Sequence, residues 1–334
     1  MKNKILALLA TIGMVSSVSA VEINENISIN GFIDASWTST DVSTAVDDDN
    51  DLDVDEVELN FLFNAGNVSG ELHIDDNDDD NNVGNIEQAH FTYSLDNGLS
   101  VQVGRFGSTL GLEGEDPAGL YTYSRAYGGV DLDSDPLTAD VNVFDLGNID
   151  DGQSGEGILL SYSTDTITVQ AAAFNGIGAQ EETSTSGATD DLDYEFAIAF
   201  TGIENLVLAA GTRSHSADSA VAADADYDVT NIYAMYTLDK LLLAGEYSNF
   251  DLEGAADDLS AYLILADYDF NDKMGIAIRY SEWESPNNAE SDKIAIAPNY
   301  AITSSLGAIL EYSSTENSAG DEEDTLALEL TFTF

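Results

Sequence analysis

One short pattern recurs about sixteen times along this chain. From Val21 onward, segments of about ten residues alternate apolar with polar or small side chains. A period of two residues is the signature of a β-strand with one apolar face. The last segment shows it most clearly, with Leu326, Leu328, Leu330, Phe332 and Phe334 interleaved by Ala327, Glu329, Thr331 and Thr333. The chain is therefore predicted to be all-β.

The pattern predicts sixteen strands, with a margin of about two because segments such as 206–215 alternate weakly. We expect them near residues 27–37, 56–63, 68–75, 87–95, 99–108, 156–164, 166–175, 192–201, 206–215, 227–238, 241–250, 259–270, 274–284, 292–302, 305–315 and 326–334.

The connections between these strands alternate strictly between short and long. The short ones are 64–67, 96–98, 165, 202–205, 239–240, 271–273 and 303–304, and the long acidic ones are 39–53, 76–86, 109–155, 176–191, 216–226, 251–258, 285–291 and 316–322. In an antiparallel meander this places all the long connections at one end. Bacterial outer-membrane barrels have this asymmetry, with short periplasmic turns and long extracellular loops, whereas a soluble sandwich has no reason to keep it. We expect a transmembrane antiparallel up-and-down β-barrel.

The first twenty residues have the form of a secretory signal. Lys2 and Lys4 precede an apolar run, and small residues ending at Ala20 follow it. The alternative, a short membrane anchor, needs about 20 apolar residues, and this run has about half that number. We expect residues 1–20 to be a signal peptide cleaved near Ala20, and residues 21–334 to form a single transmembrane barrel.

Composition excludes other classes of protein. The chain has 63 Asp and Glu residues against nine Lys and Arg, a net charge of -54, so it lacks the cations that phosphate contacts require and no nucleic-acid partner is expected. Without cysteine there is no disulfide framework and no thiolate metal site. The three histidines show no zinc motif, and we expect pore-wall roles for them and no enzymatic activity.

The exported, acidic chain resembles a known family. Its end at Phe334, behind alternating apolar residues, is similar to the signal by which barrel-assembly machinery recognises Gram-negative barrels, and sixteen strands are typical of porins. Residues 103–127, with Val-Gly-Arg-Phe-Gly-Ser at 103–108, resemble the segment entering the long third loop of OmpL-like porins. The resemblance implies an outer-membrane homotrimer, surrounded by outer-membrane lipid, that passes small hydrophilic solutes. The scarcity of Arg departs from the basic ladder of enteric porins.

Alternation also predicts which charged side chains face the lumen. If large apolar residues face lipid, an excess of carboxylates lines the wall and concentrates cations, although a wet wall would tolerate them in any case. The predicted pore-lining wall residues are Asp34, Glu58, Glu71, Asp267, Asp269, Arg279, Lys293 and Glu311.

The connection 109–155 is far longer than a hairpin needs, and such loops are usually functional or disordered. By the resemblance it is a candidate constriction loop that narrows the barrel. Its candidate residues are Glu113, Glu115, Asp116 and Arg125, with Arg105 at its entrance. Alternation points Arg105 toward lipid, so an inward position requires a bulge or a strand end, and a place at the outer rim is the alternative.

Asp49, Asp51 and Asp53 alternate like the start of a calcium loop. Val54 occupies the position where that loop needs glycine, so a solvated acidic face is the preferred interpretation, with weak calcium binding as the alternative. We expect no other cofactor.

Taken together, the sequence predicts an outer-membrane porin of a Gram-negative bacterium, with a water-filled, cation-preferring pore for passive diffusion. The first alternative is a surface-display, adhesion or receptor barrel with acidic loops, in which the lumen is closed. The second is a channel selective for one nutrient. A single-channel recording separates the first, and saturable block by a solute separates the second.

Overall fold

The structure, a computed structural model, describes residues 20–43, 49–77, 85–113, 117–127, 146, 154–175, 192–216, 226–252, 258–284 and 290–334. The predicted signal peptide lies outside these residues except for Ala20. Among the described residues, no helix has the length and apolar character needed to cross a membrane.

The described residues form seventeen antiparallel strands and one short 3-10 helix, η2 (Pro117–Gly119). The strands are β1 (Val21–Asn24), β2 (Ile27–Val42), β3 (Asp49–Ala65), β4 (Val68–Asn77), β5 (Asn85–Ser94), β6 (Leu99–Gly107), β7 (Ser154–Ser163), β8 (Ile167–Phe174), β9 (Asp193–Ile203), β10 (Leu206–His215), β11 (Tyr227–Leu238), β12 (Leu241–Leu252), β13 (Leu259–Asn271), β14 (Met274–Glu284), β15 (Glu290–Ala301), β16 (Leu306–Asn317) and β17 (Glu322–Thr333).

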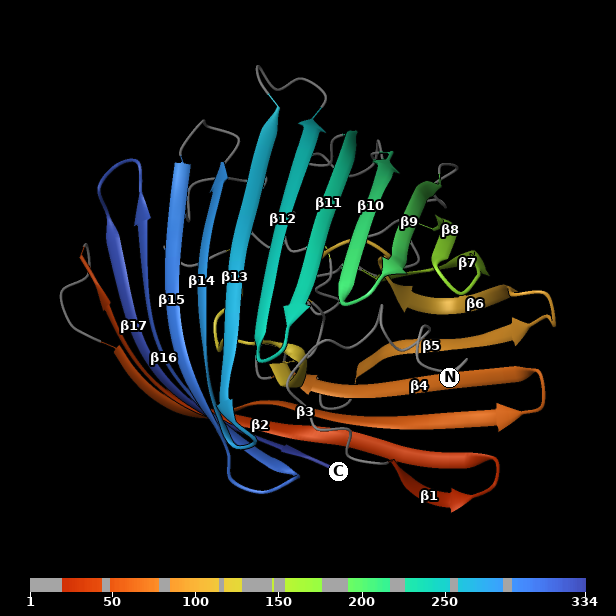
Figure 1. Ribbon diagram of the computed structural model, residues 1–334, viewed down its shortest axis with the longest axis horizontal. Coiled ribbons are helices and arrows are strands. Elements are labelled where there is room, and N and C mark those ends of the chain that lie inside the picture. The colour runs from red at the N-terminus through yellow and green to blue at the C-terminus, as the bar shows by residue number, and fades with distance from the viewer. Residues whose placement is uncertain are drawn as a thin grey trace, which may run out of the picture.

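Strands β2 to β17 close into a sixteen-stranded barrel (Figure 1). Each pairs with the next along the chain, and β17 returns to pair with β2 from Glu323 opposite Val42 to Thr333 opposite Phe32. The terminal residue completes this seam, because Phe334 N donates to Gly31 O at 3.0 Å and Gly31 N donates to Phe334 O at 3.1 Å. A closed barrel leaves no open sheet edge, which is what a membrane requires of a β-protein.

The strand prediction is confirmed in number and order, with two differences. β1 is an additional strand that pairs with Ile27 to Ile29 of β2, next to the point where β17 ends. β2 and β3 have 16 and 17 residues, longer than expected, because acidic residues from Asp49 onward continue the ladder opposite Thr40. The carboxylate of Asp51 is exposed and that of Asp53 is partly exposed while the backbone pairs, so charge does not end these strands.

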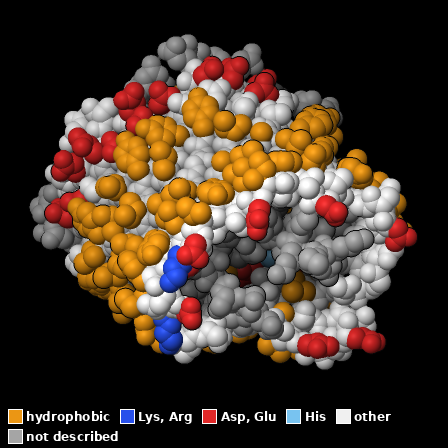
Figure 2. Space-filling view, viewed as in Figure 1, with side chains coloured by type: hydrophobic (Ala, Val, Ile, Leu, Met, Phe, Trp, Pro, Cys, Tyr) orange, Lys and Arg blue, Asp and Glu red, His pale blue; other side chains and the backbone are white. Residues whose placement is uncertain are grey.

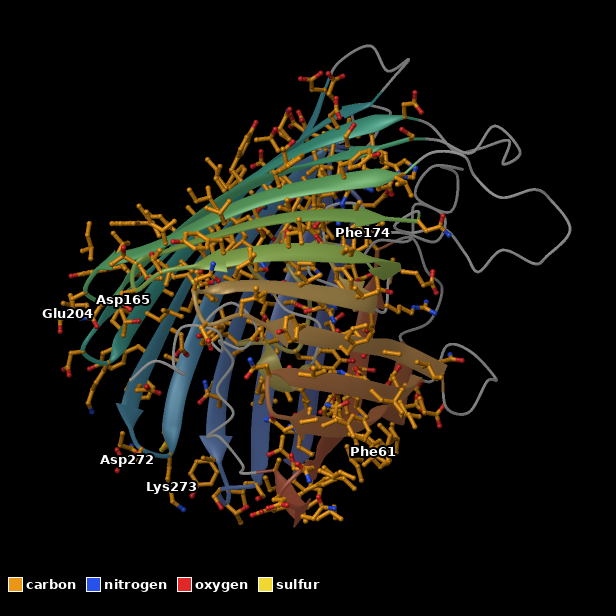
Figure 3. The ribbon with its side chains drawn as sticks, turned by 90° about the vertical axis from the view of Figure 1, so that its right-hand side faces the viewer. Phe61, Asp165, Phe174, Glu204, Asp272 and Lys273 are labelled. Carbon is orange, nitrogen blue, oxygen red and sulfur yellow. The ribbon has the colours of Figure 1, made fainter. Side chains whose placement is uncertain are left out.

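The short turns gather at one end of the barrel. Figure 3 shows Asp165, Glu204, Asp272 and Lys273 of three turns together at that end. Two of the tight turns hold a residue other than glycine in the left-handed region, Asn205 at φ 62° and Asp239 at φ 53°. Asn and Asp tolerate this conformation better than other residues because their short side chains bond locally. The alternation of short and long connections therefore has the predicted geometric consequence.

The two faces of the barrel wall differ in chemistry. Large apolar side chains such as Ile264, Phe196 and Leu160 are 60%, 57% and 47% exposed. Figure 2 shows hydrophobic side chains spread over the outer surface of the barrel. The residues that alternate with them are buried. They include charged groups such as Glu58 and Glu195, which point into the lumen. The same alternation gives an outer-membrane barrel its lipid face and its polar interior.

Candidate functional site

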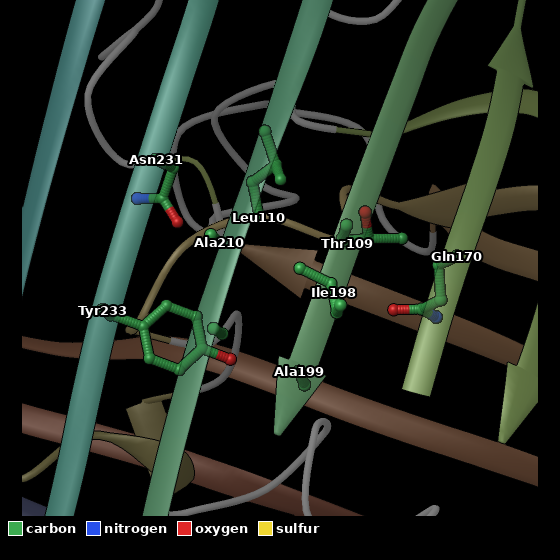
Figure 4. Close-up of a pocket in the computed structure, with 10 residues that line it drawn as sticks. Thr109, Leu110, Gln170, Ile198, Ala199, Ala210, Asn231 and Tyr233 are labelled. Carbon is green, nitrogen blue, oxygen red and sulfur yellow. The ribbon is translucent and has the colours of Figure 1, made fainter. Parts of the chain in front are cut away.

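Residues 108–113 and 117–127 of the long connection after β6 lie along the inner wall of the barrel. Their contacts begin at β9 and continue across β12, β14 and β16 to β2. Figure 4 shows the first part, where Thr109 and Leu110 lie against the wall between Gln170 and Asn231. We call residues 108–113 and 117–127 the inner loop.

Glu195 of β9 holds the start of the inner loop. Its carboxylate accepts hydrogen bonds from Ser108 Oγ at 2.8 Å and from Thr109 N at 2.9 Å. The same carboxylate pairs with the guanidinium of Arg213 at 2.7 Å, so its charge is matched. Glu195 and Arg213 are at most 1% exposed. Gly211 lies beside this anchor, where a Cβ would collide with Leu110 of the inner loop.

Glu246 of β12 is the second anchor. It accepts from the backbone N of Leu112 at 2.7 Å and from Nδ2 of Asn231 at 2.8 Å. Its other oxygen lies 3.4 Å from the hydroxyl of Tyr127, which donates to it. A wall carboxylate thus satisfies backbone and side-chain donors of the inner loop, which would otherwise be buried without partners.

Arg279 of β14 is the centre of the third anchor and is 1% exposed. Its Nη1 donates to Glu113 Oε1 at 2.6 Å and to Thr122 Oγ1 at 2.7 Å. Its Nη2 donates to the backbone O of Arg125 at 2.6 Å and to Ser124 Oγ at 3.0 Å. One guanidinium therefore ties both halves of the inner loop to the wall. Arginine suits this task because its donors form a rigid planar fork.

Neighbouring strands complete this anchor. Lys293 Nζ of β15 donates to the backbone O of Arg125 at 3.3 Å. The Glu311 carboxylate of β16 accepts from Ser124 N at 3.2 Å. Glu113 Oε2 also accepts from the backbone N of Ala126 at 2.8 Å. The structure thus brings five residues that the sequence analysis singled out into one network: Glu113, Arg125, Arg279, Lys293 and Glu311.

An apolar patch inside the barrel was not expected. On β13 the inward row is Leu259, Ala261, Leu263 and Leu265, all at most 4% exposed. Leu110, Ala126, Tyr127 and Leu146 pack against this part of the wall. The assumption that large apolar side chains face only lipid is therefore wrong on this wall, because the inner loop covers the inward row and removes it from water.

The far end of the inner loop reaches β2. Ser36 Oγ donates to the hydroxyl of Tyr123 at 3.3 Å. Burial raises the pKa of the Tyr123 phenol to about 12, and the carboxylates of Asp55 and Glu329 act in the same direction. Burial also raises the pKa of Tyr121, beside Asp267. Both phenols stay neutral at ordinary pH.

The wall formed by β2 to β5 carries several carboxylates and, besides two histidines, no basic residue. No Lys or Arg occurs between Val21 and Gly104. The inward carboxylates of this stretch are at most 7% exposed, except Glu71, which is half buried: Asp34, Glu56, Glu58, Glu71, Asp75 and Glu87. We call these six residues the acidic wall. The cations Arg213 and Arg279 of the other strands each pair with a carboxylate, so the lumen has a strongly negative side.

The remaining predicted residues fall in different places. Arg105 pairs with Ala89 and Glu156 without a register shift in β6, so it stands in the row of Val101 and Val103. This row is the one that simple alternation gives it, and its pore-lining role stays a prediction. Asp267 is buried on the inward row of β13, and Asp269 is exposed two residues further on. Glu115 and Asp116 lie outside the described residues.

Asp51 and Asp53 belong to the extended strand β3, where they pair with Thr38 and Ser36 of β2. Alternate residues of a strand share a face but stand roughly 6.5 Å apart, which does not wrap them around one ion. The side chain of Asp49 lies outside the described residues. Calcium binding here stays a prediction.

Sequence reasoning missed Arg213 and Glu87. Arg213 lies in the same row of β10 as Val207, which faces inward and is 9% exposed, so an apolar residue made this row resemble a lipid-facing one. Glu87 lies at a register shift between β4 and β5. A shift changes the face of the residues that follow it, and nothing in the local alternation marks its position. Glu56 was not singled out, although simple alternation places it in the inward row of Glu58, where it is buried.

A family model described as Gram-negative porin matches residues 6–320. No curated protein sequence matches the chain.

Solved structures resemble the fold over nearly its whole length. OmpF of Salmonella typhi in complex with daunomycin has a TM-score of 0.68 at 12% identity and covers 95% of this chain and 100% of its own. An anion-selective porin from Comamonas acidovorans has 0.67 at 13%, over 92% and 99%. The trimer form of OmpT, an outer membrane protein of Vibrio cholerae, has 0.60 at 13%, over 93% and 100%. At these identities the likeness shows the fold alone.

Proposed function

The chain belongs to the Gram-negative porin family, which puts its barrel in the outer membrane, and we propose that the pore of this barrel prefers cations. Small hydrophilic solutes and cations pass by passive diffusion through a water-filled lumen, and the long connections face the cell exterior. The protein is a channel and not an enzyme.

The acidic wall is the observation that carries the cation preference. Its six carboxylates face the lumen on strands that contain no Lys or Arg, whereas Arg213 and Arg279 are neutralised by Glu195 and Glu113. A wall of one sign in a low-dielectric surround concentrates the opposite charge. One solved structure with this fold is titled anion-selective, so the fold alone leaves the sign of selectivity open.

The inner loop supports a narrowed lumen. It crosses from β9 to β2 along the wall and is tied by three buried carboxylates and one guanidinium. At its middle, the side chains of Arg279 and Lys293 both donate to the backbone O of Arg125 on the side of β14 and β15, while the acidic wall lies on β2 to β5. This separation of charge supports the proposal of a transverse field across the constriction, which orients dipolar solutes as they pass.

Reversal potentials test the proposal. In a planar bilayer with a KCl gradient and EDTA present, the wild-type channel should favour K⁺ over Cl⁻ at about 0.1 M salt, where the Debye length is ~10 Å. The preference should fade near 1 M, where that length is ~3 Å. The triple variant Asp34→Asn, Glu56→Gln, Asp75→Asn, which neutralises three residues of the acidic wall, should lower the K⁺ preference at low salt.

The matched control removes the same number of charges from the turns, in the variant Asp165→Asn, Asp239→Asn, Asp272→Asn. Its K⁺ preference should change little, because these carboxylates lie at the ends of the strands and away from the lumen wall. Anion preference of the wild type, or an equal effect of both variants, would contradict the proposal.

The same recordings distinguish the proposed porin from two alternative functions. A surface-display, adhesion or receptor barrel gives no stable open current, and a nutrient-selective channel shows saturable block by its solute. We further propose a homotrimer, supported by the trimer form of the Vibrio cholerae structure, and insertion by barrel-assembly machinery through Phe334. Weak calcium binding at Asp49, Asp51 and Asp53 is kept as a minor proposal.

A further inference from the structure

Three side chains of the acidic wall and its strands converge on one point. Glu58 of β3, His73 of β4 and Glu87 of β5 each present an atom able to ligate a metal, and these atoms all lie within 4.8 Å of one another. They come from three adjacent strands, and Glu58 and Glu87 are 1% and 7% exposed.

A β-bulge brings Glu87 into this group. β4 and β5 pair in register up to His73 opposite Gln88, and the register shifts before Ile74 opposite Ile86. Strict alternation would put Glu87 and Gln88 on opposite faces of the sheet. The extra residue at the shift turns Glu87 inward beside Gln88, and its Oε2 lies 3.8 Å from His73 Nδ1. Bulges commonly re-aim a side chain in this way.

The contacts of His73 place both of its ring nitrogens beside carboxylates. Nε2 lies 3.3 Å from Glu71 Oε2. Nδ1 lies 2.9 Å from Glu58 Oε1, 3.8 Å from Glu87 Oε2 and 3.3 Å from Gln88 Nε2. With the Nε2–H donated to Glu71, Nδ1 is the nitrogen that would ligate an ion held between Glu58 and Glu87. A histidine ligand oriented by a carboxylate on its other nitrogen is a common arrangement at metal sites.

The burial of the Glu58 carboxylate is a second indication that a cation binds here. Its Oε2 is buried and makes no hydrogen bond within the described part of the chain. A buried carboxylate is costly unless a positive charge or several donors compensate it. No Lys or Arg occurs between Val21 and Gly104 to supply that charge.

We propose that Glu58, His73 and Glu87 bind a divalent transition-metal ion, with Zn²⁺ as the best fit, and that water or a passing solute completes its coordination. One imidazole nitrogen and two carboxylates, without a thiolate, suit zinc and its first-row neighbours. Calcium prefers six to eight oxygens and gains little from an imidazole. Glu71 acts as a positioning residue for His73. The bound ion ties β3, β4 and β5 together and reduces the negative charge of the acidic wall.

Binding of Co²⁺ to the folded, purified barrel in detergent micelles tests this site without any conduction measurement. Co²⁺ bound through His73 should give visible d–d absorption, and Zn²⁺ should displace it, while Ca²⁺ at the same concentration should not. His73→Gln should abolish the band and weaken Zn²⁺ binding at least tenfold. Glu71→Gln should weaken it by about tenfold, as loss of an orienting partner does.

His90→Gln is the matched control, because it removes another histidine from the neighbouring strand and leaves the three ligands in place. It should bind both metals like the wild type. Glu58→Gln, nearly isosteric, is the second ligand variant if His73→Gln fails to fold, as judged by circular dichroism. Unchanged Zn²⁺ affinity in a folded ligand variant, equal loss in His90→Gln, or displacement by Ca²⁺ would overturn the proposal. Selectivity for K⁺ has no influence on these outcomes.

Discussion

The side chain of Arg279 influences both the position of the inner loop and the local charge balance of the lumen. It makes four hydrogen bonds to the inner loop, two of them at 2.6 Å, and one of its partners is the carboxylate of Glu113. Both groups are removed from bulk water, so each depends on the other for compensation of its charge. The position of the inner loop and the local charge balance of the lumen thus rest on the same pair.

Replacing Arg279 by Ala should both loosen the inner loop and raise the K⁺ preference of the pore. Loss of one partner of a buried pair costs about 3–5 kcal/mol, so the barrel should also unfold at lower denaturant concentration. Reversal potentials and guanidinium unfolding in micelles measure the two effects. Lys240→Ala is the control, because Lys240 lies in a turn and bonds only the backbone O of Phe270 among the contacts seen here. An unchanged selectivity in Arg279→Ala would show that the anchor does not face the conduction path.

Tyr123 gives the inner loop a dependence on alkaline pH. Its pKa is about 12 in the folded protein, against about 10 for an unperturbed tyrosine, so the folded state holds the proton more tightly. The resulting stabilisation is complete below about pH 10 and is lost as the pH rises through about 12. Guanidinium midpoints measured from pH 9 to pH 12 should fall across this window, and Tyr123→Phe should reduce the fall. Identical pH profiles for both proteins would rule out this role.

At the scale of the element, the seam between β17 and β2 depends on the last residue of the chain. Phe334 makes two backbone hydrogen bonds to Gly31, and its ring stacks on Phe332 with centroids 6.0 Å apart. The ring also approaches Gly31, where a side chain would be in the way. The terminal strand is therefore closed by both backbone pairing and aromatic packing.

Deletion of Phe334, or its replacement by Asp, should block assembly and leave the chain as periplasmic aggregate. The seam would lose its last hydrogen bonds, and a charge would enter the lipid-facing row next to Phe332. Cell fractionation followed by immunoblotting measures the assembled fraction. Thr333→Ser is the control, because it keeps the terminal aromatic residue and the backbone bonds. Normal assembly of the deletion variant would remove Phe334 from the insertion mechanism.

The additional strand and the two longest strands show where element boundaries escape sequence reasoning. Residues 49–55 are dominated by aspartate, which is depleted in strands, yet they pair with β2. The ladder continues because β2 offers backbone groups for pairing. In a barrel, tertiary pairing extends a strand beyond the segment that its composition predicts.

At the scale of the whole molecule, the meander fixes which connections share an end. Asp272 lies in the turn between β13 and β14, and Ser318 follows β16 at the opposite end. The natural chain has no cysteine, so single cysteines at these positions are the only reactive thiols. On intact cells a membrane-impermeant maleimide should label Ser318→Cys but not Asp272→Cys, and both after lysis. Labelling of Asp272→Cys alone on intact cells would invert the proposed orientation.

The charge distribution is also a property of the whole molecule. Of the seven cations that follow the predicted signal segment, Lys240 and Lys273 lie in turns, and none precedes Arg105. Closure of the barrel brings the stretch without cations, β2 to β5, next to β16 and β17, with Arg279 and Lys293 beyond them on β14 and β15. Counting residues along the chain gives only the net charge of -54. In the closed barrel, the carboxylates on strands without Lys or Arg are concentrated on one side of the lumen.

The sequence alone determined the fold class, the strand number and the order of short and long connections. These depend on a period of two and on turn composition, which are local properties that a chain carries whatever its register. Alternation also identified Asp34, Glu58, Arg279 and Glu311 as inward residues, and all four are at most 1% exposed.

Only the tertiary structure decided which of these groups meet. Glu113 and Arg279 are separated by 166 positions, and their contact depends on the path of the inner loop and on the stagger of seven intervening strands. Register shifts beside Glu56 and Glu87 and the covered apolar row of β13 follow from the same long-range packing. Alternation specifies a face but not a partner, because pairing register and loop position are set by contacts between residues far apart in the chain.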